Sequence, residues 1–511
     1  MTTIKLNDAD LLIVGAGIMG AGIAQVAAQA GHRVKLFDAR PDAAQQAAAK
    51  LGVTLEGLVT KGKLSAIAAR AAMARIEPLA ALEGVGGIGL VIEAIVEKLD
   101  AKRALFQQLE ALVRPDCILA TNTSSISVTA IANGLQHPGR VVGMHFFNHV
   151  PLMKLVEVVA GLHTEAAVAA ATFELASAWG KTAVHARSTP GFIVNRIARP
   201  YYAETLALLH EQATTPQVLD ACLRSAGFRM GPCELIDLIG HDTNFAVTQA
   251  VYEANFFDKR YVPSPLQREM VDGGLLGRKS GRGFYRYQGD GAGPPLLPVA
   301  VYEAPATARE VQVHGDDAVA DWLERAVTHA LAAQGWGPAR VLGGGWTGLA
   351  IDGARLVLTD GRTATELAQL LGSTDVAVFD RPLVLPAPAG TALAYAVPEG
   401  VNGAWCSQAA AWLAALGFSP LRLADTPGLV VARTVAMLIN EAADAVQQCV
   451  CTPDGADAAM KLGVSYPLGP FEWLASWSPA GVVALLDALD ACYRGERYRA
   501  SPWLRRRVRT A

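Results

Sequence analysis

The sequence is poor in cysteine, in charge and in long apolar runs. Its seven cysteines are odd in number and scattered, and none forms a Cys-x-x-Cys pair, which excludes a disulfide framework and favours a reducing compartment. Charged residues make up 18% of the chain and the net charge is −3, so the composition indicates neither a nucleic-acid nor a membrane-surface partner. No apolar run approaches the roughly 20 residues that a membrane-spanning helix needs.

Two terminal stretches need a separate interpretation. Lys5 and the apolar run from Leu11 resemble a secretory signal, but Asp8 and Asp10 lie directly before that run and three glycines interrupt it. The basic residues at 505–509 are interpreted as a solvated terminus rather than as a nucleic-acid-binding arm. We therefore expect a cytoplasmic protein with no nucleic-acid and no membrane partner.

The stretch from Leu11 to Asp38 is the most informative part of the chain. An apolar run at 11–14 precedes Gly-Ala-Gly-Ile-Met-Gly, and an Ala-rich segment at 21–30 follows. This order predicts a parallel strand, a tight turn and a helix whose N-terminus binds the phosphates of a dinucleotide. A glycine-rich turn in some other α/β protein is the alternative. The predicted contacts are Gly15, Gly17, Ile18, Met19 and Gly20.

Asp38 indicates which dinucleotide is bound. It closes the next predicted strand, at 34–37, and its carboxylate would accept hydrogen bonds from the adenine ribose and repel a 2′-phosphate. We therefore predict NAD rather than NADP, although Arg40 weakens this preference slightly.

Further predicted strands lead to a candidate catalytic pair. Strands at 89–95 and 117–120 precede a polar cluster at 121–125, at the strand end where open α/β sheets bind ligands. If the apolar runs around His145 and Glu157 pair as an antiparallel ribbon, these two side chains face each other. A buried histidine held by a buried carboxylate is the arrangement of a positioned general base. Taken singly, each could instead be a satisfied core histidine or a solvated glutamate.

The last hundred residues repeat an earlier helical region. Thr426-Pro427-Gly428 echoes Thr189-Pro190-Gly191, but Asn195 of the first copy corresponds to Ala432 of the second, so the second copy is interpreted as scaffold. At 511 residues the chain needs several cores. We predict a Rossmann-type α/β domain at 1–187, an all-α helical domain at 188–290, a small mixed α/β insertion at 291–415 with a Gly/Pro-rich linker at 289–298, and a second, non-catalytic helical copy at 416–511.

Together these motifs make the sequence resemble the L-3-hydroxyacyl-CoA dehydrogenase family over about residues 8–290. They are G-A-G-I-M-G at 15–20, E-A-I-V-E at 93–97, N-T-S-S at 122–125, H-F-F-N at 145–148, K-L-V-E-V-V at 154–159, T-P-G-F-I-V-N-R at 189–196 and G-R-G-F-Y at 281–285. The insertion and the second helical copy resemble the long bacterial subgroup that acts on 3-hydroxyadipyl-CoA in phenylacetate catabolism.

The resemblance implies a role for individual residues. His145 would be the base that takes the proton of the substrate 3-hydroxyl, with Glu157 as its partner, and Ser124 and Asn195 would hold the substrate oxygen and the histidine. Cofactor contacts are implied at Asp38, Glu97, Lys102, Asn122 and Lys279. His149 stands where the family usually has proline, and it is a second, weaker candidate for the base because it lacks a paired carboxylate.

Several alternatives remain open at this stage. Lys61 and Lys63 are either solvated or contact the phosphates of an acyl-CoA substrate. The acyl group is adipyl or, as in short-chain fatty acid metabolism, butyryl. The hydroxyacid and sugar-acid dehydrogenases, which use a catalytic lysine, and a non-catalytic NAD-binding protein are the rival classes. The helical copies indicate either a homodimer or an intrachain pseudo-dimer, and we expect no metal site.

Overall fold

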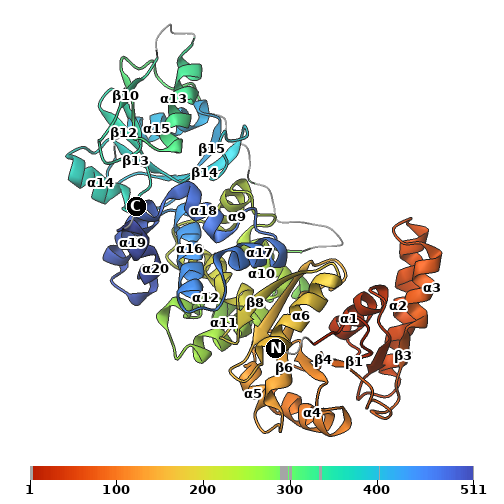
Figure 1. Ribbon diagram of the computed structural model, residues 1–511. Coiled ribbons are helices and arrows are strands. Elements are labelled where there is room, and N and C mark those ends of the chain that lie inside the picture. The colour runs from red at the N-terminus through yellow and green to blue at the C-terminus, as the bar shows by residue number, and fades with distance from the viewer. Residues whose placement is uncertain (1–3, 288–296, 298–301, 333–336, 402, 510–511) are drawn as a thin grey trace. The chain divides into compact units, whose positions relative to one another are not determined.

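The chain folds into two compact units, coloured from red to blue along the sequence in Figure 1. The computed structural model describes residues 4–287, 297, 302–332, 337–401 and 403–509. The first unit runs to Ile197 and also includes Ala445–Ser465, and the second comprises Ala198–Asp444 and the residues from Tyr466 onward. A segment late in the sequence therefore belongs to the N-terminal unit, which the linear order of predicted domains does not anticipate.

The first unit contains an eight-stranded sheet in the order β3-β2-β1-β4-β5-β6-β7-β8. Its strands are β1 (Leu11–Val14), β2 (Val34–Phe37), β3 (Ile76–Pro78), β4 (Leu90–Glu93), β5 (Ile118–Thr121), β6 (Val141–Phe146), β7 (Leu155–Ala160) and β8 (Thr182–Arg187). The strands from β3 to β6 are mutually parallel, β7 is antiparallel to β6, and β8 is parallel to β7. This topology confirms the predicted Rossmann-type domain.

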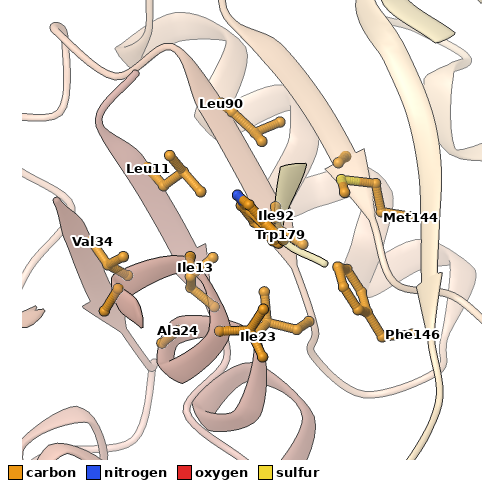
Figure 2. Close-up of a cluster of buried hydrophobic side chains, with 14 of the residues drawn as sticks. Leu11, Ile13, Ile23, Ala24, Val34, Leu90, Ile92, Met144, Phe146 and Trp179 are labelled. Carbon is orange, nitrogen blue, oxygen red and sulfur yellow. The ribbon is translucent and has the colours of Figure 1, made fainter. Parts of the chain in front are cut away.

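Nearly continuous apolar strands build the core of this unit. All four residues of β1 are buried, as are all four of β4, because helices cover a parallel sheet on both faces. Figure 2 shows Ile13 and Ile92 from neighbouring strands together with Ile23 of α1, and Phe146 and Trp179 beside them. This packing fixes the carboxyl ends of β1 and β4, where the glycine-rich turn begins.

Helices connect the strands of the first unit. They are α1 (Ile18–Gln29), α2 (Ala43–Thr60), α3 (Ala66–Ala74), α4 (Leu99–Leu112), α5 (Val128–Ala132), α6 (Ala166–Ala178), α7 (Val194–Ile197) and, from the late segment, α17 (Pro453–Gly463). Helices α2 and α3 lie side by side (Figure 1), and the predicted turn that carries Lys61 and Lys63 joins them. None of the helices within the described ranges is both long and apolar enough to cross a membrane.

The second unit contains a seven-stranded sheet in the order β10-β9-β11-β12-β13-β14-β15. Its strands are β9 (Val311–His314), β10 (Ala339–Val341), β11 (Gly348–Ile351), β12 (Ala354–Leu358), β13 (Val376–Phe379), β14 (Thr391–Ala396) and β15 (Phe418–Arg422). The strands predicted at 355–358 and 376–379 are present. The sheet continues to Arg422, beyond the predicted domain boundary at 415, and the predicted linker at 289–298 lies, apart from residue 297, outside the described residues.

Helices complete the second unit. Those associated with the sheet are α13 (Ala318–Leu331), α14 (Ala364–Leu371) and α15 (Gly403–Ala415). The first helical copy holds α8 (Arg199–His210), α9 (Pro216–Ser225), α10 (Pro232–Ile239), α11 (His241–Ala254) and α12 (Pro265–Asp272). The second holds α16 (Val431–Gln447), α18 (Pro470–Trp477), α19 (Pro479–Tyr493) and α20 (Pro502–Val508).

The two helical copies contact each other through reciprocal buried ion pairs. Glu204 of the first copy accepts hydrogen bonds from Arg497–Tyr498 of the second, at 2.8 and 3.0 Å. Glu441 of the second copy accepts hydrogen bonds from Arg260–Tyr261 of the first, at 3.3 and 2.5 Å. Each copy thus supplies the same chemistry to the other, as the two halves of an isologous contact do.

Candidate active site

His145 and Glu157 lie directly opposite each other on neighbouring strands. The ladder pairs β6 with β7 in antiparallel fashion and sets His145 against Glu157, which confirms the predicted register. Nδ1 of His145 lies 2.5 Å from Oε2 of Glu157. Glu157 is fully buried and His145 is 6% exposed. The centroid of the Phe147 ring lies 4.4 Å from the centroid of the imidazole. A hydrogen bond between such groups fixes the orientation of the imidazole.

The second oxygen of Glu157 anchors the carboxylate to the chain beyond Gly191. Oε1 accepts hydrogen bonds from the backbone N–H groups of Ile193 and Val194, each at 3.0 Å. Gly191 makes the preceding turn with φ +77°, a conformation that glycine adopts without strain. Because both oxygens have partners, the buried carboxylate cannot rotate away from the histidine without leaving donors unpaired.

Asn195 and Ser124 come together one turn further along. The amide of Asn195 donates to the carbonyl oxygen of Ser124 at 3.3 Å. Ser124 in turn donates through its backbone N–H and its hydroxyl to Glu97, at 2.8 and 3.2 Å. Asn122 lies in the same loop as Ser124. It accepts a hydrogen bond from the N–H of Phe146, the residue after His145. The predicted polar cluster is therefore joined to the strand that carries the histidine.

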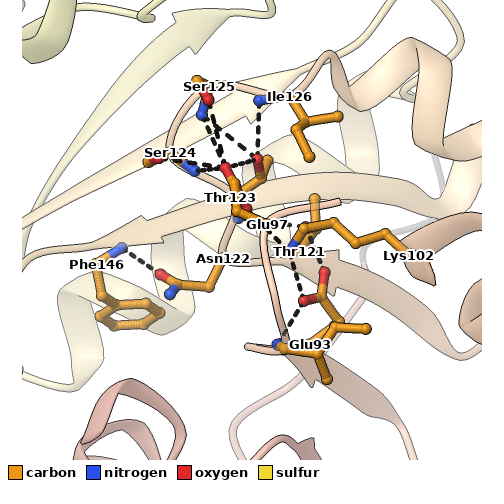
Figure 3. Close-up of polar contacts among 11 residues, drawn as sticks. Glu93, Glu97, Lys102, Thr121, Asn122, Thr123, Ser124, Ser125, Ile126 and Phe146 are labelled. Carbon is orange, nitrogen blue, oxygen red and sulfur yellow. Dashed lines mark hydrogen bonds and ion pairs between the residues drawn. The ribbon is translucent and has the colours of Figure 1, made fainter. Parts of the chain in front are cut away.

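Glu97 is held by a buried lysine, as Figure 3 shows. Lys102 is 1% exposed, and its ammonium lies 2.6 Å from Glu93 and 3.2 Å from Glu97. Burial raises the pKa of the Glu97 carboxyl, but the charge of Lys102 and the hydrogen bonds from Thr123 and Ser124 outweigh it, so the pKa is lowered from its usual value. Glu97 is thereby kept ionised as an acceptor for the loop.

The glycine-rich turn has the shape that a dinucleotide needs. Gly15 has φ +106°, and a Cβ there would lie 2.4 Å from the carbonyl oxygen of Ala94. A Cβ on Gly20 would lie 1.7 Å from the carbonyl oxygen of Gly15, so this glycine lets α1 pack against β1. Gly17 is the N-cap of α1, and no atom lies within 4 Å of where its Cβ would be. The helix N-terminus is therefore open to an anion there.

Asp38 lies beside this turn. Its carboxylate accepts hydrogen bonds from the N–H of Ala16 at 2.8 Å and from the N–H and Nε–H of Arg40 at 2.9 and 3.0 Å. Burial raises the pKa of Asp38, but Arg40 and these hydrogen bonds outweigh that effect. The pKa is therefore lowered from its usual value, and the group is ionised at neutral pH. A cavity of about 340 Å³ adjoins the turn and is lined by Gly17, Arg40 and Lys50 among others. These residues fit the adenine ribose and pyrophosphate of NAD.

Comparison with known proteins identifies the family to which this arrangement belongs. The family model for the NAD binding domain of 3-hydroxyacyl-CoA dehydrogenase matches residues 10–189, and the model for the C-terminal domain of the same enzymes matches residues 191–287 and 428–511. The chain belongs to the 3-hydroxyacyl-CoA dehydrogenase family. The predicted NAD cofactor and the predicted class of NAD-dependent dehydrogenase are thereby confirmed. A third model, for the reduced Rossmann-fold domain of 3-hydroxybutyryl-CoA dehydrogenase, matches residues 356–427.

Individual relatives of this dehydrogenase cover the chain to different extents. It is 42% identical to the 3-hydroxyadipyl-CoA dehydrogenase of Escherichia coli K12, over 98% of both chains. It is 40% identical to a probable 3-hydroxybutyryl-CoA dehydrogenase of Bacillus subtilis, which covers 54% of this chain and 97% of the relative. A crystal structure of 3-hydroxybutyryl-CoA dehydrogenase from Escherichia coli K12 is similar with a TM-score of 0.87, 40% identity and 99% coverage of both chains.

The remaining predicted site residues are exposed. Lys279 belongs to the second unit, in a short 3₁₀ helix (Arg278–Ser280), and its ammonium lies 2.5 Å from Asp242. Lys61 and Lys63 are exposed at the turn between α2 and α3. His149 is exposed, in contrast to the buried His145. The contacts proposed for these lysines remain predictions.

Two contributors to the site are absent from the sequence-based prediction. Glu93 is fully buried and accepts hydrogen bonds from Lys102, from the hydroxyl of Thr121 and from the N–H of Ile95. It is the first residue of the E-A-I-V-E motif, and this position in a family motif is the sequence feature that could have indicated its role. Gln448, from the late segment, accepts a hydrogen bond at 2.8 Å from Arg196, the residue after Asn195. No local pattern in the sequence indicates this long-range contact.

Proposed function

We propose that this dehydrogenase oxidises the 3-hydroxyl group of an (S)-3-hydroxyacyl-CoA to a 3-oxo group, with His145 as the general base. The buried pair of His145 and Glu157 carries this assignment. Because Nδ1 faces the carboxylate, Nε2 is the nitrogen that takes the hydroxyl proton. The hydride acceptor is supplied by NAD when it is bound at the glycine-rich turn.

Glu157, Ser124 and Asn195 support this base in different ways. Glu157 holds the imidazole in one orientation and stabilises its protonated form through an opposite charge. Ser124 and Asn195 are joined to each other, and the resemblance to the family assigns them to the substrate oxygen. Since the carboxylate and the loop are each held by several hydrogen bonds, the base is positioned before substrate arrives.

For the acyl group, we propose 3-hydroxyadipyl-CoA, as in phenylacetate catabolism. The support is the 42% identity to a 3-hydroxyadipyl-CoA dehydrogenase over 98% of both chains, whereas the Bacillus relative named for the butyryl ester matches only 54% of this chain. The butyryl ester is the second candidate, because the similar crystal structure bears that substrate in its name. Lys61 and Lys63 remain candidates for contacts with the coenzyme A phosphates because both ammonium groups are exposed.

A panel of thioesters tests the acyl group. The formation of NADH is followed with 3-hydroxyadipyl-CoA, 3-hydroxyhexanoyl-CoA and 3-hydroxybutyryl-CoA, of which the first two differ only in the terminal carboxylate. We expect kcat/KM for the adipyl ester to exceed that for the other two by about tenfold or more, since tenfold corresponds to roughly 1.4 kcal/mol. If the adipyl ester reacts no faster than the butyryl ester, the adipyl assignment is wrong.

We also propose an intrachain pseudo-dimer of the two helical copies and a cytoplasmic location. The reciprocal contacts of Glu204 and Glu441 support the first. All seven cysteines carry free thiols, which suits a reducing compartment and supports the second. Light scattering on the full chain measures whether it also forms a homodimer.

A further inference from the structure

A second ligand-sized cavity lies in the second unit, at the edge of its seven-stranded sheet. It has a volume of about 410 Å³. Strands β9, β10, β12 and β13 are mutually parallel, since β11 is antiparallel to both β9 and β12. The residues that follow the carboxyl ends of these four strands line the cavity, together with residues of α18 and α19. Open α/β sheets bind their ligands at this edge.

The turn after β9 excludes a second dinucleotide at this edge. Gly315 has φ +110°, close to the +106° of Gly15, and α13 begins at Ala318 as α1 begins at Ile18. However, the N-cap position held by Gly17 in the first unit is held here by Asp317, whose carboxylate accepts the N–H of Ala320 at 2.9 Å. That carboxylate already occupies the place of a pyrophosphate at a helix N-terminus. The ligand must therefore place its anion elsewhere.

Arg381 supplies the positive charge of the cavity. Its side chain is 14% exposed, and its guanidinium lies over the ring of Trp477 at 4.6 Å. The nearest carboxylate is that of Asp317, at 3.9 Å, beyond hydrogen-bond distance. The Nε atom is buried without a partner in the described part of the chain. Asp317 is thus an ion-pair partner of Arg381 but accepts no hydrogen bond from it, which leaves the guanidinium donors available to an anion in the cavity.

Backbone donors lie on the same cavity. The loop Gly343–Gly345 is exposed, with φ +77° at Gly343 and +70° at Gly345, and its three N–H groups donate no hydrogen bond to any residue that the structure describes. Alternating left-handed glycines aim successive N–H groups in one direction and form an anion-binding concavity. Arg381 and this loop together provide the donors that a phosphate requires.

An aspartate on the same edge is arranged as Asp38 is in the first unit. Asp360 follows β12 and accepts the N–H and Nε–H of Arg362 at 3.0 and 3.2 Å, which repeats the contacts of Asp38 with Arg40. In the first unit this device presents a carboxylate to the hydroxyls of a ribose. Asp360 lines the cavity and can accept from hydroxyls in the same way.

We propose that this cavity binds a nucleoside phosphate. The phosphate contacts Arg381 and the loop Gly343–Gly345, the ribose hydroxyls donate to Asp360, and Leu485 with Trp346 forms the apolar wall for the base. None of the residues that line this cavity belongs to the dehydrogenase site described above, and the proposal does not depend on the identity of the acyl group.

Calorimetric titration of the full chain with AMP tests this proposal. The titration is carried out in saturating NAD, which occupies the glycine-rich turn of the first unit, with adenosine and inorganic phosphate as parallel ligands. We expect saturable binding of AMP and binding at least about tenfold weaker for adenosine and for phosphate, since each lacks one group of contacts. No binding of AMP, or equal binding of either fragment, would overturn the proposal.

Variants locate the binding. Arg381→Met is expected to weaken AMP binding by about tenfold or more, and Arg381→Lys by less, whereas the exposed Arg309→Met serves as the matched control and leaves it unchanged. Circular dichroism checks that each variant is folded. If Arg381→Met does not fold, Asp360→Asn is used, because it keeps the size of the side chain and removes its charge. AMP binding that survives in the folded variants would place the nucleotide elsewhere and refute this assignment.

Discussion

At the scale of single residues, two histidines four positions apart lie in different environments. His145 is buried and paired with Glu157, whereas His149 is exposed in the turn that follows. Both side chains are imidazoles, so burial and the paired carboxylate distinguish the proposed base from a surface residue. The contrast provides a matched pair of substitutions.

Replacing the base is expected to abolish most of the turnover. His145→Gln removes the proton acceptor and should lower kcat by about 100- to 10,000-fold, the usual contribution of general base catalysis. NAD affinity, measured by fluorescence titration of NADH, should stay close to that of the wild type because the glycine-rich turn is untouched. His149→Gln should retain nearly full activity. Equal losses in the two variants would contradict the assignment of the base.

The buried lysine near the active-site loop gives a prediction that depends on pH. Lys102→Met leaves Glu93 and Glu97 without their cation and should reduce the free energy of unfolding at pH 7 by about 3–5 kcal/mol. The pKa of Glu97 is lower in the folded wild type than in the unfolded chain, where a glutamate has a pKa of about 4.3. The ionised carboxylate therefore stabilises the fold at pH values above the unfolded pKa. This stabilisation is lost as the pH falls through the lower pKa of the folded state.

Denaturant unfolding between pH 7 and pH 3 measures this effect. The wild type should lose stability on acidification over that window, and the difference between wild type and Lys102→Met should shrink as Glu97 is protonated. A difference that stays constant with pH would mean that Lys102 stabilises the fold through packing alone.

At the scale of secondary structure elements, two glycines of the motif formed by β1, the turn and α1 have different roles. Gly20 makes the close approach of α1 to β1, and Gly17 leaves the N-terminus of α1 open. Packing and cofactor binding therefore depend on different positions in one short motif. The strand and helix would form from propensity and pattern alone, but their distance is set by the missing side chain.

Alanine at these two positions should produce different defects. Gly20→Ala introduces a Cβ 1.7 Å from a carbonyl oxygen, so helix and strand must separate, and the thermal midpoint of the cofactor-free protein should fall by several degrees. Gly17→Ala meets no neighbour, so the cofactor-free protein should keep its thermal midpoint while NADH affinity falls by about tenfold or more. An unchanged midpoint in Gly20→Ala would show that the motif relaxes freely.

At the scale of the whole molecule, two copies of one helical design stabilise each other within a single chain. Glu204 accepts hydrogen bonds from both Arg433 and Arg497, and all of these contacts lie inside the second unit. Asp380, which follows β13, accepts the N–H groups of Val430, Val431 and Ala432 of the second copy, as Glu157 accepts those of Ile193 and Val194. Among the described residues, no histidine is recorded in a hydrogen bond with Asp380.

The ion pairs between the copies should be much stronger than those on the surface. Glu204→Gln removes the buried carboxylate that pairs with the buried Arg433 and the half-buried Arg497, and should cost about 3–5 kcal/mol of unfolding free energy. Asp487→Asn breaks an exposed pair with Arg505 and should cost no more than about 1 kcal/mol. Guanidinium unfolding of both variants provides the comparison, and similar small losses would mean that the copies are held together by apolar packing instead.

Features of this protein that depend on local pattern can be predicted from its amino-acid sequence. The strand of 11–14, the glycine turn, the position of Asp38 and the pairing of His145 with Glu157 follow from side-chain periodicity, backbone sterics and register, all of which act over short distances. The repeat of the helical copies was equally visible in the sequence.

The distant segments that support these motifs became apparent from the folded structure alone. It placed Glu93 beneath Lys102, brought Gln448 to Arg196, and assigned Ala445–Ser465 to the unit that carries the histidine. It also gathered four strand ends and Arg381 around one cavity. Such contacts arise from burial and charge pairing between segments that are distant in sequence. They depend on which segments the fold brings together and not on the residues adjacent in the chain.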